Sequence, residues 1–293
     1  MKTKDVDMLS GSITKGLLTI SLPVMVMNVL QSLFSVVDMT VLKTFDTKGT
    51  AVGAVGVCGV LISLITGLVV GIASGANVAI ARRIGMNDRE GVDRAIDSSI
   101  AFSIVAGLAL AILGISMAEV FLGCANCPDE LLPEAARYFR LYFAGVPILM
   151  VYNFCAAVMR SSGNSKGPMI YLSIGGVIKV ASSLLFIAVF KMGVEGVAYA
   201  TIVSQFVSAI LVFIVLYRTN SCVKLSFKKL CLHLLILKKI LLVGIPAALQ
   251  MAVTAFSNVF VQSYINFFDL NLPSPDTMAG WTAYLKIDQL LFL

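Results

Sequence analysis

The chain has 293 residues, of which 58% are hydrophobic and 13% are charged, and its mean hydropathy is +0.94. Ordinary soluble domains carry roughly a quarter charged residues, so this composition excludes a soluble globular protein and indicates an integral membrane protein. The formal net charge of +6 does not indicate nucleic-acid binding, because the basic residues gather in short segments between apolar runs, as in cytoplasmic loops.

The predicted elements are membrane-spanning helices. Residues 1–16 are polar, and we expect a cytoplasmic N-terminal segment there. The first apolar run is longer than a signal-peptide core and lacks an obvious small-residue cleavage site, so we interpret it as a retained span. Each helical span needs about 20 mainly apolar residues. Runs of this kind predict helices at about 17–42, 52–81, 95–122, 136–159, 168–190, 194–217 and 240–268, with an eighth beginning near 277.

Charge sets the expected sidedness. The loops after the second, fourth and sixth runs are the basic ones, and the positive-inside rule places them, and the N-terminus, in the cytoplasm. One opposite loop contains Cys124 and Cys127. Without a second pair of ligands a zinc site is not expected, and the open alternatives are free thiols or a local disulfide. Gly71, Gly75 and Ala79 form a row of small residues in the second run, typical of close helix packing.

The seventh run repeats the first. Residues 244–246 (GIP) and the polar positions after them echo residues 21–23 (SLP) and theirs, about 225 residues earlier. Six spans per repeat is an even number, so both repeats enter the membrane in the same direction, as in parallel-repeat transporters. We expect a six-helix lobe at 17–217, a basic inter-lobe loop at 218–239, and the start of a truncated second lobe at 240–293.

Asp38 and Lys179 are opposite charges within apolar runs. An ionisable group at membrane depth is costly, faces a partner or a water-filled cavity, and marks a transport pathway. Two alternatives remain for them: Asp38 extends to the outer end of its helix, or the two side chains form a purely structural ion pair. Lys179 lies 11 residues, about 16 Å, beyond Pro168, too deep for its stem to reach either surface easily.

Polar residues follow helical spacing in the first and seventh runs. Asn28, Gln31, Ser35 and Asp38 share one helix face, and Gln250, Thr254, Asn258, Gln262 and Asn266 recur every four residues. Such stripes either join neighbouring helices by hydrogen bonds or face a central aqueous cavity, one from each lobe; the matching places in the repeat favour the cavity. No Ser/His/Asp, Cys/His or paired-carboxylate constellation is visible, so we expect no catalytic residues, no metal site and no cofactor.

The order of these segments resembles the multidrug and toxic compound extrusion (MATE) family of the MOP flippase superfamily, particularly a Firmicutes-type branch. The similarity runs from about residue 12 to 293. Its matching segments are residues 22–38, residues 71–81 (GIASGANVAIA), Tyr152-Asn153 followed by residues 159–165 (MRSSGNS), residues 193–201 (GVEGVAYAT) and Ser204-Gln205.

The resemblance implies a multi-pass plasma-membrane protein that exports small organic, often cationic compounds in exchange for H+ or Na+, with two lobes alternating access. It implies cation coupling at Asp38. Where many members carry Asn and then Asp or Asn in the fifth helix, this chain has Lys179 and Ser183, so we expect Lys179 to act as a tethered cation that disfavours sodium at this site. The expected cavity residues are Asn28, Gln31, Ser35, Tyr152, Asn153, Ser183, Gln250, Asn258 and Gln262. Two alternatives are a non-transporting fragment and a flippase for lipid-linked oligosaccharide.

Overall fold

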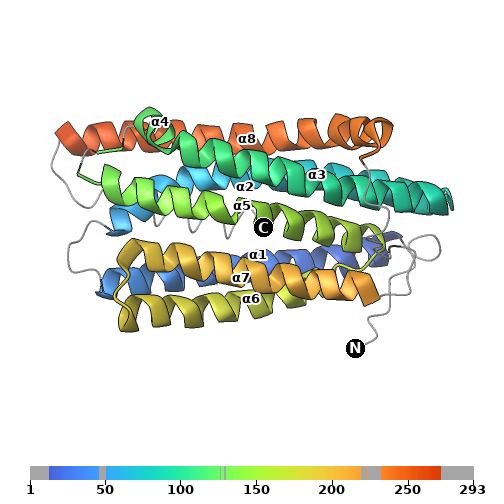
Figure 1. Ribbon diagram of the computed structural model, residues 1–293, viewed down its shortest axis with the longest axis horizontal. Helices are drawn as coiled ribbons and strands as arrows, with labels where there is room; N and C mark the ends of the chain where they lie inside the picture. Colours follow the sequence, from blue (N-terminus) through green and yellow to red (C-terminus); the bar gives the residue numbers. More distant parts are fainter. Residues whose placement is uncertain are drawn as a thin grey trace.

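The computed structural model describes residues 13–45, 51–125, 127–128, 130–218, 223 and 232–271, and these fold as an all-α protein (Figure 1). Its elements are α1 (Ile13–Phe45), α2 (Ala51–Gly85), α3 (Arg89–Ser116), α4 (Ala118–Cys124), α5 (Leu132–Ser161), α6 (Lys166–Leu184), a π-helical turn η1 (Leu185–Val189), α7 (Gly193–Arg218) and α8 (Leu234–Asn271). In this part of the chain, 7 helices are long and apolar enough to cross a membrane, which confirms the predicted class.

The predicted spans match these helices with three differences. The third run, predicted at 95–122, is divided at Met117 into α3 and α4. The fifth run changes from α-helix to the π-helical turn η1 after Leu184. Helix α8 begins at Leu234 and so includes the end of the segment 218–239 that was predicted as a loop. The eighth predicted span lies outside the described residues.

Two short turns between the helices are built in similar ways. Between α2 and α3, Asn87 adopts φ 56°, and Asp88 Oδ1 accepts a hydrogen bond from Gly91 N at 2.9 Å. Between α5 and α6, Gly163 adopts φ 84°, and Asn164 Oδ1 accepts from the N–H of Gly167 at 3.0 Å. Each side chain satisfies a backbone donor that the first turn of a helix leaves free.

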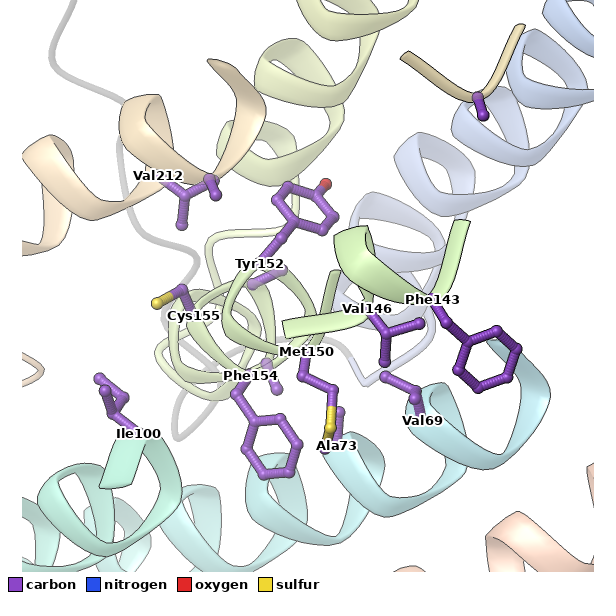
Figure 2. Packing of buried hydrophobic residues seen from close by; sticks show 14 of the residues in the cluster. Val69, Ala73, Ile100, Phe143, Val146, Met150, Tyr152, Phe154, Cys155 and Val212 are labelled. Atoms are coloured by element: carbon purple, nitrogen blue, oxygen red, sulfur yellow. The ribbon is translucent and has the colours of Figure 1, made fainter. Parts of the chain in front are cut away.

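Helix α5 lies at the centre of the lobe and packs on α2, α3 and α7. Figure 2 shows Met150 and Phe154 of α5 pointing toward α2, while Val212 of α7 lies on the opposite side of α5. Phe154 and Met150 are fully buried. This central apolar cluster holds the long helices side by side, as Figure 1 shows.

Helix α8 packs closely on α2 through glycines. A methyl group at Gly75 would overlap the carbonyl oxygen of Ile240 and lie 2.6 Å from the backbone nitrogen of Gly244, and one at Gly71 would overlap the backbone of Ala248. Only glycine permits such a close approach of two helix backbones. The prediction that the small-residue row in the second span serves helix packing is therefore confirmed at Gly71 and Gly75.

Candidate functional site

The two charges predicted at membrane depth meet at the contact between α1 and α6. Lys179 Nζ lies 2.6 Å from Asp38 Oδ2, and the side chains are 21% and 7% exposed respectively. Asp38 Oδ2 is buried and accepts no hydrogen bond from the residues that the structure describes. The ammonium group of Lys179 therefore supplies the counter-charge for this buried oxygen.

Ser183 completes the site from the same helix as Lys179. Its hydroxyl donates a hydrogen bond of 2.9 Å to Asp38 Oδ1, and the side chain is fully buried. Residues four apart lie on one face of an α-helix, so α6 presents a cation and a hydroxyl donor to the two oxygens of one carboxylate. Both groups contact the carboxylate directly.

The pair lies deep within its helices. Lys179 is 13 residues beyond Lys166, the start of its candidate span, so it lies about 20 Å along a helical segment about 36 Å long. The Asp38 side chain turns toward α6 and is buried there. The alternative that Asp38 extends to the outer end of its helix is therefore wrong.

The polar stripes of α1 and α8 lie on separate parts of the structure. On α1, Gln31 is exposed and Ser35 is half-buried; on α8, Gln250 is exposed and Asn258 is half-buried. Helix α8 packs on α2 and α3, whereas α1 packs chiefly on α6. The side chains of Asn28, Gln262 and Asn266 lie outside the described residues. The shared cavity between the two stripes stays a prediction.

Tyr152 and Asn153 are buried in the core of the lobe. The Tyr152 hydroxyl donates to the carbonyl oxygen of Pro168 at 3.3 Å, and Asn153 Nδ2 donates to the carbonyl oxygen of Leu149 at 2.8 Å. Figure 2 shows Tyr152 within the buried cluster. These bonds join α5 to the start of α6 and tie Asn153 to its own helix, and the predicted contact of both residues with substrate stays a prediction.

Cys124 and Cys127 are not joined by a disulfide, and the buried Cys58 and Cys155 are free thiols. Across the part of the chain that the structure describes, no three His, Cys, Asp or Glu side chains are grouped to hold a metal ion.

Two residues beside the ion pair were not identified from the sequence. Phe34 of α1 packs against Gly176 of α6, where a side chain would overlap its ring. The sequence does contain a feature that indicates this contact. Gly175 and Gly176 are adjacent and lie about one turn before Lys179, and small residues within a membrane helix favour close packing.

Comparisons with known proteins agree with this architecture. The MatE family model matches residues 23–185. The chain is 26% identical over 292 residues to a probable multidrug resistance protein, YpnP, of Bacillus subtilis, covering 99% of this chain and 63% of that protein. It is 27% identical to the probable multidrug resistance protein NorM of Thermotoga maritima, covering 96% of this chain and 60% of NorM.

Solved structures give the same result. An outward-facing multidrug resistance MATE family transporter of the MOP superfamily superposes with a TM-score of 0.84 at 26% identity, covering 99% of this chain and 63% of that one. A MOP superfamily transporter from Pyrococcus furiosus gives 0.85 at 25% identity, with the same coverage. The chain thus spans somewhat less than two thirds of the relatives it matches. Its helices, their order and the family match establish that this chain belongs to the MatE family of multi-pass membrane proteins.

Proposed function

We propose that this chain forms the first lobe and the start of the second in a secondary exporter of small organic, chiefly cationic compounds. The exporter works across the plasma membrane, with its N-terminus in the cytoplasm and no enzymatic reaction. The observation that carries the proposal is the buried site in which Asp38 is neutralised by Lys179 and held by Ser183. The similarity to probable multidrug resistance proteins supports the class of substrate.

In the proposed mechanism, Lys179 occupies the place of a transported cation. A proton that binds Asp38 removes the negative charge, so the ammonium loses its attraction and is released from the carboxyl group. Loss of that proton on the other side of the membrane restores the pair. The exchange gives the lobe two states whose populations depend on protonation, which is what coupling to alternating access of two lobes requires.

The chemistry of the site favours H+ over Na+. A sodium site requires several oxygen ligands free of a competing cation, and the ammonium group already lies 2.6 Å from Asp38 Oδ2. A proton needs only one oxygen. The membrane potential contributes about 2.3 kcal/mol per 100 mV for each net positive charge that enters. It therefore drives the exchange only if more than one proton enters for each exported monovalent cation, and a one-to-one exchange is driven by the pH gradient.

The alternative activities have less support. A flippase for lipid-linked oligosaccharide needs cationic groups free to hold pyrophosphate, whereas Lys179 is neutralised by Asp38. A non-transporting fragment would fit the partial coverage of the relatives. Reading the DNA beyond codon 293 separates that case, because an open frame that encodes further spans restores a complete transporter.

The test measures export of a fluorescent organic cation by cells that express the full reading frame, with and without H+ and Na+ gradients. Export above empty-vector cells that collapses with the proton gradient supports the proposal. The Lys179→Asn variant should insert normally but change its ion dependence. Lys191→Asn is the matched control, because Lys191 is exposed and adopts φ 53°, which Asn tolerates. Absence of export across a broad substrate panel would overturn the proposal.

A further inference from the structure

We propose that Phe34 and Gly176 are positioning residues that set the distance between Asp38 and Lys179, so that the packing of one aromatic ring controls the charge state of the carboxyl group. The inference rests on the proposed function of the pair. It concerns how α1 and α6 are held together, and neither residue touches the carboxylate in this role.

The Phe34 ring packs into the space that Gly176, which has no side chain, leaves on the surface of α6. This space at Gly176 is called the notch. A methyl group at Gly176 would overlap the edge of the Phe34 ring and lie 2.6 Å from its Cζ atom. Phe34 therefore lies directly against the backbone of α6. The phenyl ring is rigid and only two torsions place it, so it fixes the separation of two helices more firmly than a long flexible side chain such as methionine does.

An adjacent face of the same α6 turn is held by α7. Ser204 Oγ donates to the carbonyl oxygen of Gly175 at 2.6 Å, and Ser208 Oγ donates to the carbonyl oxygen of Tyr171 at 3.2 Å. A methyl group at Gly175 would overlap the Ser208 hydroxyl. Because these contacts fix α6 against α7, extra volume at Gly176 displaces α1.

The Phe34–Gly176 contact and the Lys179–Asp38 ion pair both lie along the interface between α1 and α6. Asp38 is four residues after Phe34, and Lys179 is three residues after Gly176, so each pair of neighbours shares one helix face. The two contacts are about one helical turn, 5.4 Å, apart. A displacement of α1 at the notch is therefore passed to the Lys179–Asp38 contact of 2.6 Å and to the Ser183 hydrogen bond of 2.9 Å.

The carboxyl group is sensitive to this displacement because it is buried. Asp38 is 5% exposed, and its Oδ2 atom has no hydrogen bond from the described residues to replace the ammonium group. A buried carboxylate that loses its counter-charge is disfavoured and binds a proton. A change of packing at Gly176 that separates Lys179 from Asp38 should therefore favour protonation of Asp38.

The experiment measures that protonation by chemical labelling. A hydrophobic carbodiimide, dicyclohexylcarbodiimide, adds to protonated carboxyl groups in membranes, and the adduct on Asp38 is quantified by mass spectrometry at neutral pH. Lys179→Met provides the reference for an unpaired carboxyl group. We expect Gly176→Ala to raise labelling several-fold, toward that reference, and Phe34→Ala in the Gly176→Ala background to restore a low level by making room for the methyl group.

Two control variants test whether the effect is specific to Gly176 or follows from any glycine-to-alanine change. Gly145→Ala also introduces a clash between helices, because its methyl group would lie 2.8 Å from Ile202 Cγ1, and Gly59→Ala faces open space. Both should label like the wild type. If Gly176→Ala does not insert, Phe34→Trp decides, because the larger ring also presses α1 away from α6 and should raise labelling.

The outcomes separate this inference from the proposed function. If Lys179→Met raises labelling but neither Gly176→Ala nor Phe34→Trp does, the positioning role is overturned while the coupling pair stands. Failure of Phe34→Ala to reverse the Gly176→Ala effect also overturns it, as does an equal rise in Gly145→Ala. If Lys179→Met itself leaves labelling unchanged, Lys179 does not control the charge of Asp38, and the proposed mechanism fails first.

Discussion

Removal of the Lys179 charge should destabilise the protein by an amount that the site geometry bounds. At a separation of 2.6 Å and an effective dielectric constant of about 20, the attraction between the two charges is about 6 kcal/mol. Lys179→Met removes it and leaves a buried carboxylate. The cost has a ceiling, because the carboxyl group can instead bind a proton, and protonating an ordinary aspartate at pH 7 costs about 4 kcal/mol. We therefore expect a loss of about 3 to 4 kcal/mol, within the range for broken buried pairs.

The assay is a double-mutant cycle on the free energy of unfolding, measured by titrating the protein from mild detergent into sodium dodecyl sulfate. Asp38→Asn in the Lys179→Met background removes the unpaired charge while keeping an oxygen to accept the Ser183 hydrogen bond. The double variant should recover most of the loss, with a coupling energy of about 2 kcal/mol or more. Lys191→Met should change stability by less than about 0.5 kcal/mol, because this side chain is exposed. A Lys179→Met loss below about 1 kcal/mol, or no recovery in the double variant, would refute the reasoning.

Three further predictions follow from individual contacts. Ser183→Ala should cost about 1.5 to 3 kcal/mol in the same unfolding assay, because it removes a buried hydrogen bond to a charged group; a loss within experimental error would contradict this role. Gly75→Leu should cost more than about 3 kcal/mol, because its side chain would meet the backbone of α8, whereas Gly59→Leu should be tolerated, and equal stability of the two variants would argue against the α2–α8 packing. In a variant whose only cysteines are Cys124 and Cys155, a membrane-impermeant maleimide added outside intact cells should label the exposed Cys124 and spare the buried Cys155; labelling only after permeabilisation would reverse the proposed sidedness.

Hydropathy was sufficient to predict the 7 spans found among the described residues, because a lipid environment requires long apolar helices and penalises charge. The same penalty made the meeting of Asp38 and Lys179 predictable as one of the alternatives, since two opposite charges at membrane depth need partners. The geometry confirms their contact at 2.6 Å.

Tertiary packing set the features that periodicity alone did not predict. The division of the third span at Met117 falls within one predicted run. Ser116 and Glu119 lie beside it, but no proline or glycine at that position marks a break. The packing of Phe34 against Gly176 depends on which helix lies beside α1. Helical spacing shows that polar residues such as Gln250 and Asn258 share one face of their helix. It does not show whether that face contacts another helix or solvent.

The most direct test of the account measures proton-driven transport by the purified protein, expressed from its full reading frame, in proteoliposomes. Uptake of a fluorescent organic cation is followed while an H+ or a Na+ gradient is imposed, in wild-type protein and in Asp38→Asn. The account predicts that the wild type responds to the H+ gradient and that Asp38→Asn, although inserted and folded, loses this response. Full gradient-driven uptake by Asp38→Asn would contradict the claim that the buried pair of Asp38 and Lys179 carries the coupling.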